Sequence, residues 1–570
     1  MDRLSDKFWL KSYKLGPYKL PETLQPYPKV PLYKILDNAA TDYPTKVAID
    51  YEGKEIRYRE LKLMVDSLAN ALIALGTKRG KSIAILLPSC PQFIISDFAI
   101  LKTGAFTTPI SPLHKADEIE YELKQCQAET IICLEDHLDL VSSIKGKTNI
   151  QNVIVTSVKD YTAEQGGTPK RIPGRYSLRE LMVKNEAEPP PSEPDIDPME
   201  DLAYLAFTGG ATGVPKGVML THYARYCNLM QGLAWVYSPL IESIKGKSSL
   251  IIPLPLYHTY AHWACQASIH LGLRIILIPD PRDTDTLIKL MQQHRPLLVC
   301  TVPTQLMRMA EKKIGRMPVM VMSGAAPLPK RVADAVSAEL KMPISEGYGL
   351  TETGPLTHIN LSTFSKITGF APSVKLSIGV PIPDTEVKLI DPDTGKDADF
   401  TREGELYLRG PQIMKGYWPN KGSGLTKDGW IASGDIARVD EDGYFYIVDR
   451  VKDMANVSGY KVYTTTIDEV LFTHPAVAMA AAIGIPDPER LGSDRIKVFI
   501  RLKEGHEGKV TAEEIIEHCQ DRVPPYAVPK FIEFRKDLPL TVSEKLFKRA
   551  LRDEEIAKMK KAGSLSEQPY

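Results

Sequence analysis

Apolar residues recur with two different spacings along the first third of the chain. Between residues 58 and 76 the helical spacing predicts an apolar face formed by Leu61, Val65, Leu68, Leu72 and Leu75. Beyond this helix, strand and helix patterns alternate in the order strand 82–88, helix 91–103, strand 106–110, helix 117–127 and strand 130–134. Because parallel strands need a crossover between them, this alternation predicts a parallel sheet covered by helices.

Farther along, the pattern changes twice. Residues 379–417 are rich in strand-forming positions and predict a β-rich subdomain. A charged segment at 449–453 then precedes about 115 residues in which strands and helices alternate again, enough for a small α+β domain. We therefore predict an α/β protein with a large N-terminal domain over 1–450, made of helix-covered, mainly parallel sheets plus the β-rich subdomain, and a C-terminal domain over 451–570.

Composition narrows the class of protein. Lys+Arg and Asp+Glu both number 71, so nucleic acid is not expected as a partner, nor is an acidic membrane as the main partner. Seven cysteines without a C-x-x-C pair predict reduced thiols and a cytoplasmic protein. The uncharged stretch 248–273 contains prolines and histidines and is expected to be buried core, with peripheral membrane contact left open.

A glycine-rich stretch follows a buried strand predicted at 201–207. It reads Thr208-Gly209-Gly210-Ala211-Thr212-Gly213 and continues through Pro215 and Lys216. Glycines let backbone N–H groups approach an anion, and threonine and lysine add donors suited to phosphate oxygens. An ordinary glycine-rich turn is the alternative. A Walker-type loop is excluded, because a proline precedes the lysine and a glycine follows it.

Three other segments place small or polar residues directly after predicted strands. Gly324 and Ala325 follow one strand, Tyr348 and Gly349 follow the next, and Asp435 follows a third. A flat ligand can lie against such a backbone, and an aspartate can accept two hydrogen bonds from vicinal hydroxyls. Tight turns and a capping aspartate are the alternatives.

An aromatic–histidine corner lies at residues 250–263. His258 and His262 have the i, i+4 spacing of two metal ligands on a helix, but no third ligand accompanies them. The alternative is that these histidines, with Tyr257 and Trp263, line a pocket or pack in the core.

Taken together, these motifs resemble one family. The stretch 208–217, the sequence Gly-Tyr-Gly-Leu-Thr-Glu at 347–352 and the segment 538–552 are similar to signatures of the AMP-forming acyl- and aryl-CoA synthetases, luciferases and adenylation domains. The phosphate-loop signature differs only at Gly209 and Ala211. The chain is most like the medium- and long-chain fatty-acid–CoA ligases.

The resemblance implies activation of a carboxylic acid with ATP and Mg²⁺, followed by transfer of the acyl group to CoA. It implies phosphate contacts from residues 208–213, Lys216 and Thr351, and adenine contacts from Gly324, Ala325, Tyr348 and Gly349. Magnesium would be held by Thr208 and Glu352, and ribose by Asp435 and Arg450. Lys452 would be the hinge of a mobile C-terminal domain, Lys545 the catalytic lysine, and Tyr257, His258 and Trp263 the border of the acid pocket.

The sequence departs from the family pattern mainly near its C-terminal end. Glu544 replaces the glycine before the catalytic lysine, Thr464 and Thr466 replace a proline and a glutamate, and Asn456 replaces a lysine. These changes affect the expectation of CoA transfer more than that of adenylation.

The identity of the acid is left open. Apolar tunnel candidates favour a medium- or long-chain fatty acid; they are Trp235, Tyr257, Cys265, Val302 and Met322. The alternatives are an aryl acid, an acceptor other than CoA, and a catalytically silent nucleotide-binding protein. A homodimer is a further expectation.

Overall fold

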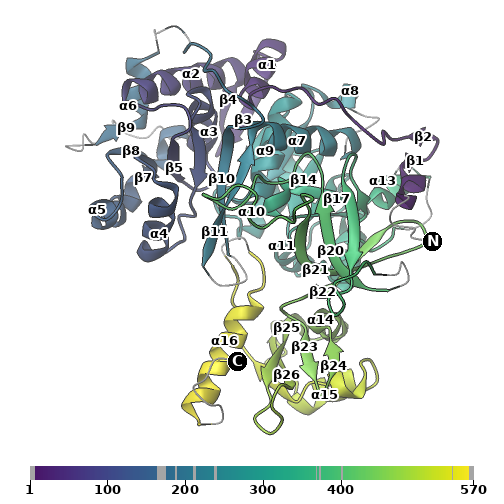
Figure 1. Cartoon of the computed structure of the whole chain (residues 1–570). Helices are drawn as coiled ribbons and strands as arrows, with labels where there is room; N and C mark the ends of the chain where they lie inside the picture. Colours follow the sequence, from purple (N-terminus) through teal and green to yellow (C-terminus); the bar gives the residue numbers. More distant parts are fainter. Residues whose placement is uncertain are drawn as a thin grey trace.

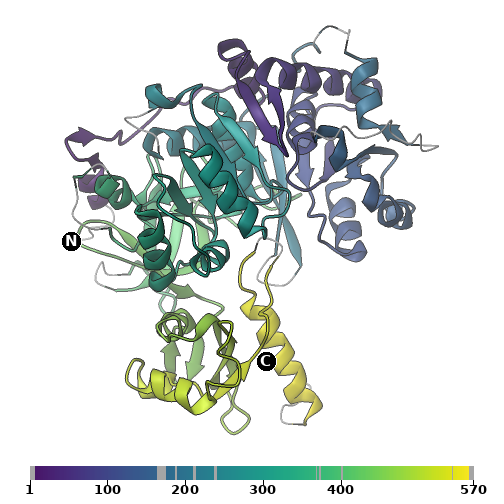
Figure 2. The ribbon, with the colours of Figure 1, turned by 180° about the vertical axis from the view of Figure 1, so that it is seen from behind.

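The structure is a computed structural model. It describes residues 7–563 of the 570-residue chain except 163–174, 187–188, 190, 210–213, 237–240, 368, 371–373, 399–401 and 542–543. A large upper part contains two wide sheets and their helices, and a smaller lobe formed by the C-terminal segment lies below it (Figure 1). From behind, helices cover the sheets of the upper part, as in Figure 2.

The first sheet has seven strands, in the order β11 (Pro215–Thr221), β10 (Leu202–Gly209), β6 (Phe106–Pro109), β5 (Ser82–Leu86), β7 (Thr130–Leu134), β8 (Asn152–Thr156) and β9 (Tyr176–Ser177). All neighbours from β10 to β9 are parallel, whereas β11 is antiparallel to β10. The strands predicted at 82–88, 106–110 and 130–134 and their parallel pairing are confirmed.

The second sheet has nine strands, in the order β18 (Val380–Pro381), β17 (Leu356–Ile359), β16 (Ile344–Gly349), β15 (Met320–Ser323), β14 (Leu298–Thr301), β12 (Ser249–Ile252), β13 (Arg274–Leu277), β3 (Val47–Tyr51) and β4 (Lys54–Arg57). From β16 to β3 the strands are parallel, and the edge strands β17, β18 and β4 are antiparallel. The predicted α/β class is therefore correct.

Helices of the upper part are α1 (Lys34–Asp42), α2 (Tyr58–Ala74), α3 (Pro91–Lys102), α4 (Ala116–Cys126), α5 (Leu138–Lys145), α6 (Leu178–Lys184), α7 (His222–Val236), α8 (Ile241–Ile244), α9 (Thr259–His270), α10 (Thr284–His294), α11 (Pro303–Ala310), α12 (Lys330–Leu340) and α13 (Leu361–Ile367). The α2 helix buries Leu61, Val65, Leu68 and Leu72 completely. Burial of each such side chain stabilises the fold by about 1.5–3 kcal/mol. Gly76, which follows the end of this helix, has a φ of +94°, a conformation that favours glycine.

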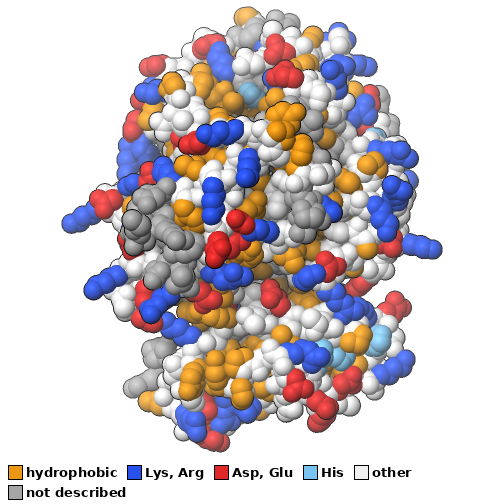
Figure 3. Space-filling view, turned by 90° about the vertical axis from the view of Figure 1, so that its right-hand side faces the viewer, with side chains coloured by type: hydrophobic (Ala, Val, Ile, Leu, Met, Phe, Trp, Pro, Cys, Tyr) orange, Lys and Arg blue, Asp and Glu red, His pale blue; other side chains and the backbone are white. Residues whose placement is uncertain are grey.

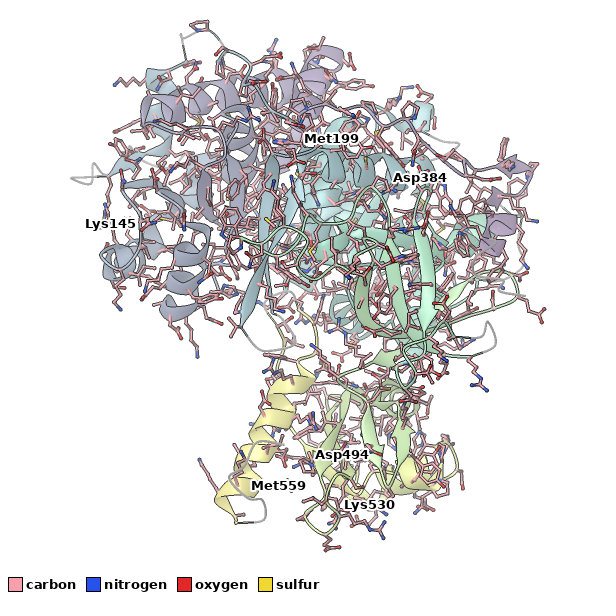
Figure 4. The ribbon with its side chains drawn as sticks, in the orientation of Figure 1. Lys145, Met199, Asp384, Asp494, Lys530 and Met559 are labelled. Carbon is pink, nitrogen blue, oxygen red and sulfur yellow. The ribbon has the colours of Figure 1, made fainter. Side chains whose placement is uncertain are left out.

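The β-rich subdomain is a four-stranded antiparallel sheet of β19 (Glu386–Ile390), β20 (Gly404–Arg409), β21 (Ile431–Val439) and β22 (Phe445–Arg450). The N-terminal arm contains η1 (Phe8–Ser12), β1 (Lys14–Leu15) and β2 (Tyr18–Lys19). The arm packs on this sheet: Trp9 contacts Phe445, and the hydroxyl of Tyr27 donates to Asp384, which Figure 4 labels near the top of the green strands.

The smaller lobe has its own core. It contains β23 (Ala455–Val457), β24 (Tyr460–Val462), β25 (Val477–Pro486), β26 (Asp494–Leu502), β27 (Phe531–Phe534), α14 (Thr464–Phe472), α15 (Ala512–Gln520) and α16 (Lys548–Lys561). Residues such as Ile467, Ala480, Val498 and Ile515 are buried there within a cluster separate from the upper core. Figure 3 shows this lobe from the side, below the larger part. Among the helices that the structure describes, none combines the length and apolarity needed to cross a bilayer.

Candidate active site

The predicted phosphate loop lies at the tip of an antiparallel hairpin. Thr208 on β10 pairs with Lys216 on β11, and Gly209 pairs with Pro215. The residues between them, Gly210, Ala211, Thr212 and Gly213, lie outside the described residues. The hairpin places the threonine hydroxyl and the lysine on directly opposed positions. The following helix, α7, begins as predicted, since Thr221 Oγ1 accepts a 3.1 Å hydrogen bond from the backbone N–H of Ala224.

Glu352 faces this hairpin from the short 3-10 turn η4 (Thr351–Thr353). Its Oε1 accepts a 2.9 Å hydrogen bond from the hydroxyl of Tyr417. The ammonium of Lys216 lies 5.1 Å from the centroid of the Tyr417 ring. Burial and the Glu352 charge raise the pKa of Tyr417, so the phenol stays a donor. Tyr417 thus connects the predicted phosphate lysine with the predicted metal ligand, a role for which the sequence carried no signal.

Thr351 lies at the start of the same turn. Its hydroxyl is 3.3 Å from the hydroxyl of Thr259, at the beginning of α9. The predicted α-phosphate ligand therefore adjoins the corner that carries His258.

A three-residue network lies on the neighbouring strands. The hydroxyl of Tyr348 donates to Asp435 Oδ2 at 2.6 Å, and Arg450 Nε donates to Asp435 Oδ1 at 3.0 Å. Asp435 and Arg450 are directly opposed on β21 and β22, and Asp435 is buried. The aspartate charge raises the pKa of Arg450, which stabilises its positive charge. Three residues predicted from separate motifs therefore form one network.

Two glycines border this network closely. A Cβ on Gly349 would lie 1.7 Å from the carbonyl oxygen of Pro355, so no larger residue fits there. A Cβ on Gly324 would lie 3.2 Å from the ring of Tyr260. Ala325 follows with a φ of +72°, which turns the backbone sharply after β15. Small residues are needed at 349 because of backbone contact, and at 324 because of a neighbouring ring.

Lys545 reaches this site from the smaller lobe. Its loop is closed by a 2.7 Å hydrogen bond from the Thr541 N–H to the Lys545 carbonyl oxygen. Burial and the positive charge of Arg450 lower the pKa of Lys545 to about 8, against the opposing effects of Asp435 and Glu352. Burial and the Lys545 charge likewise lower the pKa of His258 to about 3. The lysine therefore lies among the predicted ribose, metal and acid-pocket residues.

Two family models match this chain. The family described as "AMP-binding enzyme" matches residues 36–418, and the "AMP-binding enzyme C-terminal domain" matches residues 466–545. This chain belongs to the AMP-binding enzyme family. The resemblance inferred from the sequence motifs is thereby confirmed.

Several members of the family are similar over their whole length. A long-chain-fatty-acid–CoA ligase of Bacillus subtilis is 33% identical over 577 residues, covering 97% of this chain and 98% of the relative. One of Yersinia pestis is 34% identical over 575 residues, with the same coverages.

Two solved structures share the fold. The anthranilate CoA ligase AuaEII with anthranoyl-AMP has a TM-score of 0.81 at 24% identity, covering 95% of this chain and 99% of its own. ATP-bound MatB from Rhodopseudomonas palustris has a TM-score of 0.80 at 24% identity, covering 92% and 99%.

His258 and His262, in the predicted acid-pocket corner, do not bind a common partner as two ligands of one metal ion would. His258 Nδ1 accepts a hydrogen bond from the backbone N–H of Tyr260 and caps α9, whereas His262 Nε2 lies 2.7 Å from Asp97 Oδ2. Within the described part of the chain, no group of three or more His, Cys, Asp or Glu residues could hold a metal ion. The two histidines therefore serve different partners. Trp263 is buried, and its indole N–H donates to the Asn228 carbonyl oxygen at 3.3 Å.

A buried polar network beneath this corner is absent from the sequence predictions. Arg225 on α7 is completely buried and donates to the Gly354 carbonyl oxygen at 2.7 Å and to Gln266 Oε1 at 2.6 Å. Its guanidinium also lies 3.4 Å from His262 Nδ1, and His262 in turn contacts Asp97. Gly354 directly follows the turn that carries Glu352. The hydrogen bond from Arg225 to Gly354 therefore stabilises the turn that positions the predicted metal ligand.

Three of the unusual C-terminal residues of this family member have defined contacts. Thr464 Oγ1 donates to Asp449 Oδ2 at 3.3 Å, and Lys548 Nζ donates to Thr464 Oγ1 at 2.8 Å. The Asn456 amide donates to the Gly492 carbonyl oxygen at 3.1 Å. Glu544 contacts the upper part of the molecule. Thr466 is exposed, and nothing in the structure explains it.

Proposed function

We propose that this chain is an AMP-forming fatty-acid–CoA ligase that acts on medium- or long-chain acids. The observation that carries the proposal is that the charges of Arg450, Asp435 and Glu352 act on the pKa of Lys545, which belongs to a different part of the chain. Relatives named long-chain-fatty-acid–CoA ligases, which match nearly the whole chain, support the fatty acid as substrate.

The proposed reaction has two halves. A carboxylate oxygen of the acid attacks the α-phosphorus of ATP, and the bond to pyrophosphate breaks, which yields an acyl-adenylate and pyrophosphate. The CoA sulfur, having lost its proton, then attacks the acyl carbon, and AMP leaves. The first half brings two anions together, so it requires positioning and neutralisation of charge rather than a protein nucleophile.

We assign the charge neutralisation to groups at the hairpin and at the lysine loop. Lys216, Thr351 and Lys545 would contact the phosphates, and Asp435 would accept hydrogen bonds from the ribose hydroxyls. Tyr348 and Gly349 would lie against the adenine. Short, charged hydrogen bonds of this kind contribute about 1.5–3 kcal/mol each.

Mg²⁺ fits the donor set at Glu352 and Thr208. Carboxylate and hydroxyl oxygens are the hard ligands that Mg²⁺ prefers. Tyr417 uses Glu352 Oε1, while Oε2 accepts no hydrogen bond from the described residues. Magnesium bound there would offset phosphate charge in the adenylation step.

The second half would require a different arrangement of the two parts. We propose domains at 1–450 and 451–570, with Lys452 as the hinge between them. Lys452 lies in the turn that follows β22, where the Met454 N–H bonds to the Arg450 carbonyl oxygen at 3.1 Å. If Lys452→Pro left both half-reactions unchanged, the hinge would be wrong.

The apolar character of the acid corner supports an alkyl chain. Trp263 and Met322 are buried in the apolar core cluster and Tyr257 packs against it, and His258 stays neutral because its pKa is about 3. We also propose a cytoplasmic location, which the seven buried, unpaired cysteines support. Peripheral membrane contact and a homodimer stay predictions.

Pyrophosphate release from ATP tests the proposal. It would be measured with acids from acetate to palmitate, and with benzoate and a cinnamate, in the presence and absence of CoA. We expect CoA-dependent turnover that peaks at one alkyl chain length and is lost in Lys545→Met. A peak with benzoate would instead indicate an aryl-acid ligase. Adenylate formation without a CoA response would indicate another acceptor, and ATP binding without turnover a silent protein.

A further inference from the structure

Glu544 directly precedes Lys545 and has an unusual backbone conformation. Its φ is +61°, in the left-handed region that glycine adopts freely and that a residue with a Cβ disfavours. The family pattern has glycine at this position. A glutamate here must therefore gain enough from its contacts to offset an unfavourable backbone.

Those contacts join the smaller lobe to helix α11 of the upper part. Arg308 Nη2 donates to Glu544 Oε2 at 2.6 Å, and the Glu544 side chain is only 9% exposed. The hydroxyl of Thr304 donates to the Glu544 carbonyl oxygen at 2.6 Å. One turn of α11 thus binds both the side chain and the backbone of Glu544.

The rest of α11 contacts the smaller lobe as well. Met307 packs against an apolar cluster that contains Phe499, Leu538 and Leu551. In Figures 1 and 2, the loop before α16 rises from the smaller lobe to the underside of the upper part. An ion pair between Arg501 and Glu311 at 3.2 Å joins the same two parts directly after the end of α11.

We propose that Glu544 is a positioning residue that holds Lys545 in the site during adenylate formation, through its ion pair with Arg308. The inference rests on the proposed function, because it assigns the contact to one of the two half-reactions. For the second half-reaction the lysine loop would leave α11, and the ion pair would break. Glu544 would therefore assist the first half-reaction and not the second.

The two half-reactions can be measured separately. Adenylate formation is followed as pyrophosphate release in a single turnover with ATP and the preferred acid. Thioester formation is followed from supplied acyl-adenylate and CoA. For Glu544→Gly we expect adenylate formation to slow by about tenfold, the effect of losing about 1.4 kcal/mol of positioning energy. We expect thioester formation to stay within about twofold. Glycine suits a φ of +61°, so this variant relieves backbone strain.

A double-mutant cycle tests whether Glu544 acts through its ion pair with Arg308. Arg308→Met should also slow adenylate formation selectively, and the double variant should be no slower than the slower single variant. The matched control is Glu311→Gln, which removes the ion pair between Glu311 and Arg501 directly after α11 and should leave both half-reactions unchanged.

Three results would overturn the inference. They are an unchanged adenylation rate in Glu544→Gly, an equal slowing of both half-reactions, and additive effects in the double variant. If the unaltered chain itself released no pyrophosphate with any acid, the proposed function would fail before the variants are compared.

Discussion

Tyr348 and Asp435 are 87 residues apart in the chain, yet the tyrosine hydroxyl donates a 2.6 Å hydrogen bond to Asp435 Oδ2. The other oxygen of the same carboxylate binds Arg450. Asp435 therefore joins the second sheet to the β-rich subdomain, and these two hydrogen bonds fix the orientation of its carboxylate.

We expect Asp435→Asn to raise the KM for ATP by about 10- to 150-fold. The substitution removes a charged acceptor, and each such hydrogen bond is worth about 1.5–3 kcal/mol. ATP titrations of pyrophosphate release check this. Asp393→Asn is the control, because Asp393 pairs with Lys461 at an exposed position and should leave the KM unchanged. Equal KM values for the two variants would contradict the assignment.

The pH dependence should report Lys545. Its pKa is lowered to about 8, so the ammonium is charged below that pH and loses its proton as the pH rises through it. We expect kcat/KM for ATP, which reports the free enzyme, to fall as the pH rises through about 8. Lys545→Arg keeps its charge at every pH and should show a lower but flatter profile. A fall of the same steepness in this variant would assign the titration to another group.

Gly349 and Gly347 form a matched pair. A Cβ on Gly349 would lie 1.7 Å from a backbone oxygen, whereas one on Gly347 would have its nearest neighbour at 3.6 Å. We expect Gly349→Ala to destabilise the protein by about 1–3 kcal/mol, which lowers the thermal unfolding midpoint of a chain of this size by about 1–3 °C, and to weaken ATP binding. Gly347→Ala should leave the midpoint close to its original value. Similar midpoints in the two variants would argue against the close approach.

The buried network at Arg225 should matter for stability. Asp97→Ala would leave Arg225 without the nearby negative charge, and an uncompensated buried charge costs about 3–5 kcal/mol. We therefore expect Asp97→Ala to unfold at a clearly lower urea concentration than the unaltered protein. Asp334→Ala removes an exposed pair with Lys330 and should change the free energy of unfolding by less than about 0.5 kcal/mol. Equal shifts of the urea midpoint in Asp97→Ala and Asp334→Ala would show that the network around Arg225 does not stabilise the fold.

Local patterns were enough to predict much of the fold. The strand at 130–134 agrees with β7 residue for residue, and the helix from 58 is confirmed as α2, because both depend on the burial of neighbouring positions. The antiparallel pairing of β10 with β11 and the order of strands in each sheet could not be predicted in this way. Strand pairing and strand order depend on contacts between segments that are far apart in the chain. The local spacing of apolar residues carries no information about such contacts.

In the candidate site, too, local sequence patterns predict some residues, whereas contacts between distant segments bring in the others. The motifs predict Glu352 and Asp435 as site residues, and they single out Glu544 as a departure. They do not predict Tyr417, the partner of Glu352, or Arg308, the partner of Glu544. Both partners stand in segments without a distinctive pattern, and only the packing of α11 and of the chain after β20 brings them to the site. The contact between Glu544 and Arg308 joins residues 236 positions apart, so it leaves no local pattern in the sequence.

The N-terminal arm has a consequence for the order in which the protein is completed during synthesis. Lys11 and Ser12 bind backbone oxygens of residues 430 positions later, and Tyr13 binds the Pro381 carbonyl oxygen. At about 5–20 residues per second, a ribosome needs about 20–90 s to make that intervening chain. The arm therefore emerges long before the β-rich subdomain against which it packs, and its aromatic residues stay accessible to chaperones until that subdomain has been made.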